Sequence, residues 1–243
     1  MRKKSLKSTL FIAALLVGNV SIKAASITEA TGPEELSSTL QILVLLTFLT
    51  LLPSIVLTMT SFTRTIITFS LLRNGLGTQT TPPNQVLIGI ALFLTFFIMA
   101  PVIDEMKTEA LDPYSEGIIS QDEFVVNIQE PIKQFMLKNT RSKDLELFVG
   151  LSDIDIPETA DELPLYIIIP SFILSELKTA FEIGFLILIP FIVIDFIVSS
   201  VLLSMGMMML PPVLISLPFK ILLFVLIDGW YLVVQSLVES FAH

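Results

Sequence analysis

Long apolar segments alternate with polar ones along this chain of 243 residues. The apolar positions group into four segments, at residues 39–62, 86–103, 165–205 and about 211–238. Each of the first two is close to the ~20 residues that a membrane-spanning helix needs, whereas the third is about twice that length. We therefore expect four helical segments that run in two pairs.

Two prolines and a polar patch interrupt the third segment. Pro170 and Pro190 each lack a backbone donor and would crowd the preceding turn of a helix. The charged residues Glu176 and Lys178 lie between them, and we expect both to be buried. This pattern predicts a partly polar helix that leads into a membrane-like run at 186–203, not one straight helix.

A polar region at 104–164 separates the two pairs. Its apolar residues recur at three- and four-residue steps, which is typical of amphipathic helices with one apolar stripe. These residues are Phe124, Ile128, Ile132, Phe135 and Met136, followed by Leu145, Phe148 and Val149. We expect each stripe to pack against a neighbouring helix, another copy of the chain or a partner.

The predicted fold is an all-α membrane protein made of two long kinked helical hairpins. The first hairpin occupies 26–103 and has a loop at 63–85. The second occupies 165–243 and has a methionine-rich turn at 205–212. The helical, acidic region between the hairpins is expected to be periplasmic.

Composition supports a membrane protein and argues against several kinds of site. Hydrophobic residues make up 53% of the chain, charged residues 15%, and the mean hydropathy is +0.83; one soluble core cannot bury so much apolar surface. There is no cysteine, and the single histidine is His243. Because no zinc-binding histidine pair, phosphate loop or Gly-x-Ser-x-Gly elbow occurs either, we expect no enzyme, no metal and no cofactor.

The N-terminus has the order of a secretory signal peptide. A basic stretch of Arg2, Lys3, Lys4 and Lys7 precedes a short apolar run at 10–17, and small residues follow. We assign 1–25 to this signal. The alternative is an uncleaved anchor, because Ile22 or Lys23 occupies the −3 position of the expected cleavage sites.

Loop charges predict how the segments are oriented. The loop at 63–85 contains Arg64 and Arg73 and no acid, which indicates the cytoplasmic side. Residues 104–162 contain fifteen acids and five bases, a balance that suits the outer face. Both the N-terminus of the exported chain and the C-terminus are then periplasmic.

Charged residues inside the apolar segments should be buried against protein or water. Asp195, Lys220 and Asp228 have apolar neighbours on both sides, and an unpaired charge at membrane depth costs several kcal/mol. We hypothesise that Asp195 and Lys220 pair across the second hairpin. The alternative is that Lys220 reaches the cytoplasmic face alone.

The turn of the second hairpin is rich in methionine. Four of the nine methionines, Met205, Met207, Met208 and Met209, fall within five residues. Three further residues define the turn: Gly206, Pro211 and Pro212. A methionine cluster is most often core that fills gaps, but several copies of this turn around an axis would form a deformable seal.

Several sequence blocks resemble the FliP family, whose members belong to the flagellar type III export gate and whose relatives serve injectisomes. The blocks include Ser61-Phe-Thr-Arg, Leu72-Arg-Asn-Gly-Leu-Gly-Thr, Pro190-Phe-Ile-Val-Ile-Asp, Met205-Gly-Met-Met-Met-Leu-Pro-Pro, Leu217-Pro-Phe-Lys and Asp228-Gly-Trp. The resemblance covers essentially the whole chain after the signal.

The resemblance implies an assembly in the bacterial inner membrane at the flagellar basal body. It implies a homo-oligomer, expected to be a pentamer, with FliQ and FliR, and further contacts with FlhB, FlhA and membrane lipid. This assembly would enclose a lumen through which unfolded flagellar proteins pass, and the four methionines of the turn would form a gasket in it. No nucleic acid would bind.

Two other classes remain open from the residues alone. The broken helices and Asp195 would also suit a secondary transporter or an ion channel. The acidic amphipathic region would also suit a membrane scaffold that has no pore of its own.

Overall fold

The computed structural model describes residues 33–78, 80–152, 159–207 and 209–241, and the regular elements in these ranges are helices. The predicted signal at 1–25, together with Met208 and His243, lies outside the described residues. The chain divides into two units, Met1–Pro53 and Ser54–His243.

In the first unit, the described residues belong to α2 (Pro33–Met59), which continues into the second unit. Its described side chains from Leu40 to Leu52 are exposed, and most of them are apolar. The Thr47 hydroxyl donates to the Leu43 carbonyl at 2.8 Å, so its hydrogen bond is made within the helix. Such a helix suits an apolar solvent.

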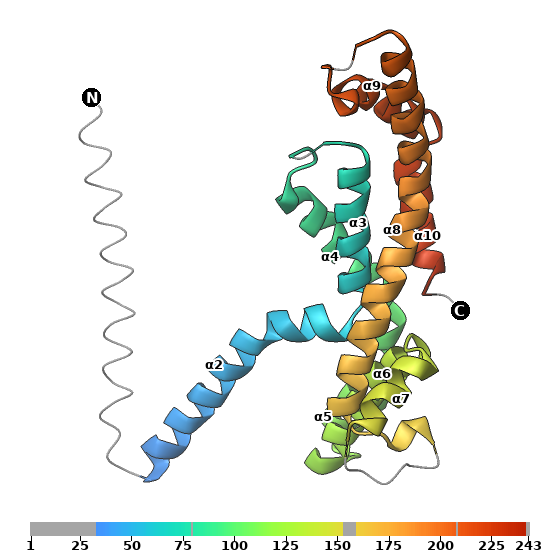
Figure 1. Cartoon of the computed structure of the whole chain (residues 1–243). Helices are drawn as coiled ribbons and strands as arrows, with labels where there is room; N and C mark the ends of the chain where they lie inside the picture. Colours follow the sequence, from blue (N-terminus) through green and yellow to red (C-terminus); the bar gives the residue numbers. More distant parts are fainter. Residues whose placement is uncertain (1–32, 79, 153–158, 208, 242–243) are drawn as a thin grey trace, which may run out of the picture. The chain divides into compact units, whose positions relative to one another are not determined.

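The second unit contains the remaining helices. They are α3 (Phe62–Gly75), α4 (Asn84–Met106), a π-helical turn (Lys107–Leu111), α5 (Asp112–Ser115), α6 (Gln121–Lys138), α7 (Ser142–Gly150), a 3-10 turn (Ala160–Glu162), α8 (Leu165–Ser204), α9 (Pro212–Leu226) and α10 (Gly229–Glu239). The longest, α8, has α9 near one end and α6 and α7 near the other (Figure 1).

The predicted interruption of the third apolar segment is wrong, because α8 is one helix of 40 residues that contains Pro170 and Pro190. Each proline costs one helical hydrogen bond, and packing along the helix compensates. Helix α3 packs against α8 so closely that a Cβ on Gly184 would lie 2.3 Å from Leu71 Cδ1.

The predicted loop at 63–85 is also incorrect over most of its length, because residues 62–75 form α3. Phe62, Phe69 and Leu72 are buried on one side of this helix, at spacings of seven and three residues. Arg64 and Arg73 are therefore helical residues. Helix α3 packs against α4 and α8, and α8 packs against α9.

Two apolar clusters form the core of the second unit. One joins α3, α4, α8, α9 and α10 and includes Phe69, Leu72, Phe191 and Phe224. The other joins α4, α6, α8 and the end of the chain and includes Met99, Phe135, Met136, Phe172 and Phe241. The amphipathic helices expected in the acidic region are present as α6 and α7.

The fourth apolar segment, expected as one arm, is bent by 63° between α9 and α10. The bend lies at Asp228, which has a left-handed backbone with φ of 53°. Gly229 follows, and a Cβ there would lie 2.2 Å from the Phe224 ring. Aspartate tolerates this conformation better than most residues, and glycine leaves room for the ring.

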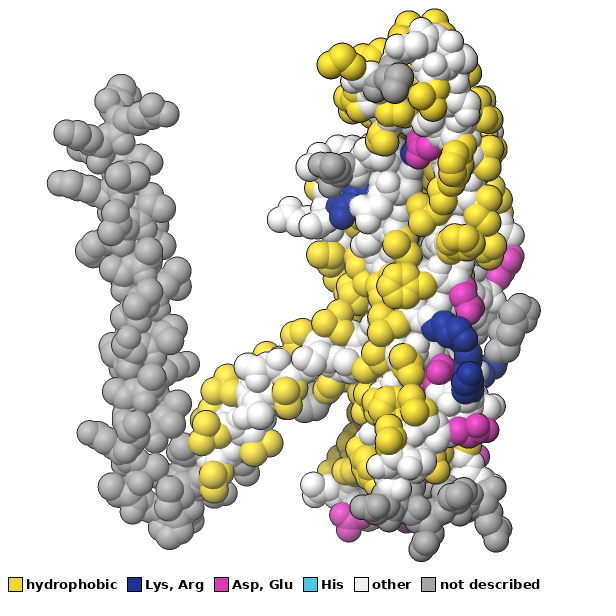
Figure 2. Space-filling view, in the orientation of Figure 1, with side chains coloured by type: hydrophobic (Ala, Val, Ile, Leu, Met, Phe, Trp, Pro, Cys, Tyr) yellow, Lys and Arg dark blue, Asp and Glu magenta, His cyan; other side chains and the backbone are white. Residues whose placement is uncertain are grey.

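Three helices of the described ranges are long and apolar enough to cross a membrane, and four if α9 and α10 together form one span. Figure 2 shows apolar side chains over much of the surface of the second unit. This surface is larger than a monomeric soluble protein normally exposes.

Candidate functional site

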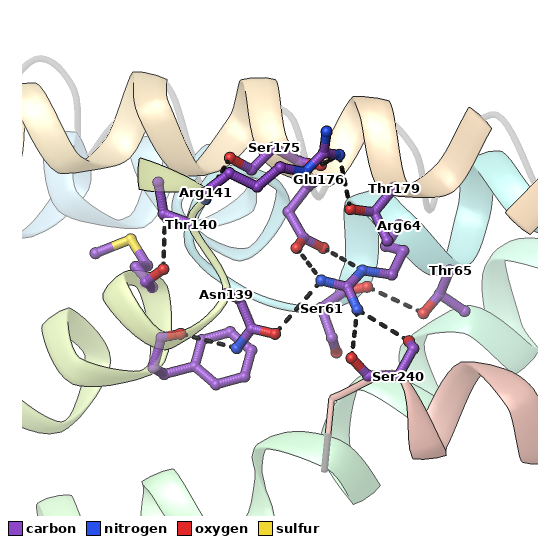
Figure 3. A network of polar contacts seen from close by, with 12 residues as sticks. Ser61, Arg64, Thr65, Asn139, Thr140, Arg141, Ser175, Glu176, Thr179 and Ser240 are labelled. Atoms are coloured by element: carbon purple, nitrogen blue, oxygen red, sulfur yellow. Dashed lines mark hydrogen bonds and ion pairs between the residues drawn. The ribbon is translucent and has the colours of Figure 1, made fainter. Parts of the chain in front are cut away.

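The most buried ion pair among the described residues joins Arg64 on α3 to Glu176 on α8 (Figure 3). Their side chains are 4% and 0% exposed. Arg64 Nε donates to Glu176 Oε2 at 3.0 Å, and Arg64 Nη2 donates to Glu176 Oε1. The pairing is bidentate, the geometry that best offsets the cost of burying two charges.

The rest of the guanidinium binds the ends of two other helices. Nη1 donates to the carbonyl and the hydroxyl of Ser240 at 2.8 and 2.9 Å, just after α10. Nη2 also lies 3.4 Å from Asn139 Oδ1, just after α6. The Phe241 ring stacks on the guanidinium, with Cζ 3.6 Å from the ring centroid. The Arg64 side chain therefore joins α3, α6, α8 and α10, and we call this group of contacts the Arg64 centre.

A second polar contact extends this centre along α8. The Arg141 amide donates to Ser175 Oγ at 3.1 Å, and Ser175 Oγ donates to Asp144 Oδ2 at 2.6 Å. Arg141 Nη2 reaches Thr179 Oγ1 at 3.2 Å. Lys178, predicted to be buried, is 57% exposed and only 3.9 Å from Glu182. The single chain does not bury it, because it lies on the opposite side of α8 from Arg64.

The predicted pair of Asp195 and Lys220 is confirmed. Lys220 Nζ on α9 lies 2.6 Å from Asp195 Oδ2 on α8. Ser216 Oγ donates to Asp195 Oδ1 at 2.5 Å, and Lys220 also donates to the Gly75 carbonyl in the last turn of α3 at 3.2 Å. The pair therefore joins three helices, and Lys220 does not reach solvent alone, since it is 3% exposed.

Asp228, also predicted to be buried, is exposed in the single chain. Its position at the bend between α9 and α10 turns it away from the core. Among the described residues it forms no ion pair. For the single chain, the prediction that Asp228 is buried is therefore wrong.

The methionine turn joins α8 to α9 and is one of the most exposed parts of the second unit. Met209 is 99% exposed, Met205 60% and Met207 40%. Gly206 has φ of +74°, a conformation that favours glycine, and its amide donates to the Leu203 carbonyl to end α8. Pro212 begins α9. Gap-filling in a core is excluded for the described methionines of this turn within the single chain.

Sequence reasoning missed most of the Arg64 centre. Arg64 was assigned to a loop, and Asn139, Ser240 and Phe241 were not considered. A signal was available, because an arginine in the amphipathic stretch at 62–76 and a glutamate in an apolar segment both need a partner. Their separation of 112 residues hides the pairing. No group of three metal-ligating side chains occurs within the described ranges.

Comparison with known proteins gives one family. A profile of the FliP family matches residues 45–237. The chain is 57% identical over 216 residues to the flagellar biosynthetic protein FliP of Bacillus subtilis, covering 89% of this chain and 98% of the relative. Identity to FliP of Pectobacterium carotovorum is 52% over 86% of this chain and 81% of that protein. For FliP of Aquifex aeolicus it is 49%, over 97% and 100%.

Proposed function

Because the chain belongs to the FliP family of flagellar biosynthetic proteins, we propose that it is a pore-forming subunit of the flagellar type III export gate. In this proposal several copies, with FliQ and FliR, surround a lumen in the inner membrane at the basal body. FlhB and FlhA make further contacts. Unfolded flagellar proteins pass through the lumen, and both termini of the exported chain face the periplasm.

The observation that carries the pore is the exposure of the methionine turn. Met209 is wholly exposed at 99%, and Met205 and Met207 are 60% and 40% exposed. Apolar side chains at the tip of two packed helices are costly in water. Several tips that meet at an axis would cover one another, and unbranched thioether side chains can adapt to a chain that passes between them.

Apolar surface on α8 and α9 supports assembly with other subunits. A groove of about 410 Å³ between the two helices has an entirely apolar lining, formed by Ile194, Ile197, Val198, Val201, Leu202, Ile215 and Phe219. Neighbouring residues such as Phe196 and Leu214 are 69% and 66% exposed. Helices of other subunits or lipid would cover this surface.

The ion pairs explain how the turn can be both exposed and well placed. Asp195 and Lys220 link α8 to α9 and to the last turn of α3. The two helices that support the turn are therefore fixed to a third helix, which Arg64 fixes in turn to the far end of the unit. The tip can yield without its supporting helices separating.

The gasket is tested by changing the size of the methionine side chains. In the assembled gate, alanine at 205, 207, 208 and 209 should increase the leak of small ions, and leucine, which keeps the volume, should leak less. Membrane conductance and swimming would be measured together. Alanine at Met99, which is 5% exposed in the core, is the matched control. Tight membranes with all four alanines would contradict the gasket.

A further inference from the structure

Among the described residues, two charged side chains in the apolar part of the chain have no partner of opposite charge. Residues 62–103 and 183–238 contain five charged side chains: Arg64, Arg73, Asp195, Lys220 and Asp228. Arg64 pairs with Glu176, and Asp195 pairs with Lys220. Within the described ranges, Arg73 and Asp228 form no ion pair.

Hydrogen bonds hold the Arg73 guanidinium in place, but not all of its donors have an acceptor. Its Nη1 donates to Asn84 Oδ1 and lies 3.4 Å from the Pro82 carbonyl. Its Nε is buried and finds no acceptor among the described residues. A guanidinium with unused donors in an apolar environment is expected to meet a carboxylate, because an unpaired charge there is costly.

Asp228 supplies the opposite charge. It is exposed at the bend between α9 and α10, and its carboxylate caps neither helix. Its neighbours Ile227 and Trp230 are 46% and 37% exposed, so apolar surface surrounds the carboxylate. This surface leaves Asp228 in need of a cation once another molecule covers it.

The two residues lie at the same level of the second unit. On α3, Arg73 lies between Phe69, whose ring centroid is 6.2 Å from that of Trp230, and Gly75, whose carbonyl accepts from Lys220. In the chain, Asp228 lies between Lys220 and Trp230. Both charges therefore fall within about two helical turns of each other along α3.

We propose that Asp228 of one copy pairs with Arg73 of the next copy in a ring. This inference rests on the proposed function, which supplies the ring. A head-to-tail interface between identical chains uses two different patches, so one charge of each sign at the same level satisfies every copy when the ring closes. Neither lipid tails nor an apolar helix would neutralise both residues.

Cross-linking tests the contact directly, because the chain contains no cysteine. Full-length R73C and D228C chains with different tags would be co-expressed with the other gate subunits and treated with a short bis-maleimide. An Arg–Asp pair exceeds the reach of a disulfide, which needs Cα atoms within about 7 Å. We expect a product that carries both tags, which proves a contact between copies.

A matched pair, K178C with D228C, should give at least about fivefold less product. Lys178 is exposed near Glu176, the partner of Arg64, and Arg64 is nine residues, about 14 Å, from Arg73 along α3. Equal yields from the two pairs, or no R73C–D228C product from an assembled ring, would overturn the inference. If no ring forms even with the wild-type chain, the proposed function itself fails.

Charge reversal gives a second readout. R73D and D228R alone should each reduce flagellar export about tenfold or more, because like charges then meet at the interface. The double variant should recover to within about threefold of wild type, since the pair is restored in the opposite order. A double variant as poor as the worse single one, with normal chain levels, would contradict the pairing.

Discussion

The Arg64 centre and the methionine turn lie toward opposite ends of α8 and differ in how complete they are. The side chains of Arg64 and Glu176 are 4% and 0% exposed, and they find their partners within the chain. Met209 is 99% exposed at the other end. The first region stabilises the subunit by itself, whereas the second acquires its contacts only from other molecules.

This difference separates two kinds of failure. Loss of a contact at Arg64 should damage the folded chain before any assembly forms. Loss of a methionine should leave the fold intact and affect only the assembled gate. The pair of Asp195 and Lys220 lies between these cases, because Asp195 is 33% exposed in the single chain.

The largest effect is expected from R64A. This change leaves the Glu176 carboxylate buried without a cation, which costs about 3–5 kcal/mol. Denaturant unfolding of the detergent-extracted chain would measure the loss. The double variant R64L/E176L removes both charges and should recover most of it, because apolar residues of similar volume can replace a buried pair. A double variant as unstable as R64A would show that packing, not charge, dominates this centre.

A smaller loss, about 2 kcal/mol, is expected for K220A. It leaves Asp195 without its cation, but solvent at the partly exposed carboxylate reduces the penalty. The Gly75 carbonyl also loses a donor. The same unfolding measurement applies, and the double reversal D195K/K220D should be more stable than either single reversal. A loss as large as that of R64A would mean that water does not reach Asp195.

The sequence predicted the parts of the fold that depend on local pattern. The stripes around Phe124–Met136 and Leu145–Val149 correspond to α6 and α7, since an amphipathic period is a property of neighbouring residues. The pairing of Asp195 with Lys220 followed from the cost of a lone charge in an apolar segment. Both positions flank one short turn, so few alternative partners existed.

Features that depend on distant packing were not predicted. Pro190 suggested a break, but contacts along α8 keep the helix continuous. The pattern predicted a loop at Arg64, but this residue lies in α3 and its partner Glu176 is 112 residues away. The bend at Asp228 could have been found, because an Asp-Gly pair is a common turn signal. Its significance was hidden by the apolar residues on both sides.

Packing between α3 and α8 should show an intermediate effect. G184A places a Cβ 2.3 Å from Leu71 Cδ1 and 3.1 Å from Leu71 Cβ. Leu71 must move, and we expect a loss of about 1–2 kcal/mol. G89A in α4 is the control, because nothing lies within 4 Å of its added Cβ and alanine favours a helix over glycine. Equal effects of the two changes on the unfolding free energy would argue against close α3–α8 packing.

The smallest effect is expected in the acidic region, at the start of α6. Hydrogen bonds from the backbone amide and the hydroxyl of Ser120, at 2.8 and 2.9 Å, lower the pKa of Glu123. Because its pKa is lower in the folded chain than in the unfolded one, ionised Glu123 stabilises this helix end at neutral pH. That stabilisation disappears as the pH falls through the lowered pKa.

Amide exchange in the first turn of α6 would measure this loss between about pH 5 and about pH 3. Protection relative to the unfolded chain should fall in wild type more steeply than in E123Q, which can still accept a hydrogen bond but does not titrate in this range. Backbone amides around Arg64 supply the contrast, because their hydrogen exchange should not depend on the ionisation of Glu123. Parallel loss of protection in wild type and E123Q would assign the pH dependence to other carboxylates of the acidic region, and the capping contact would then contribute little to α6.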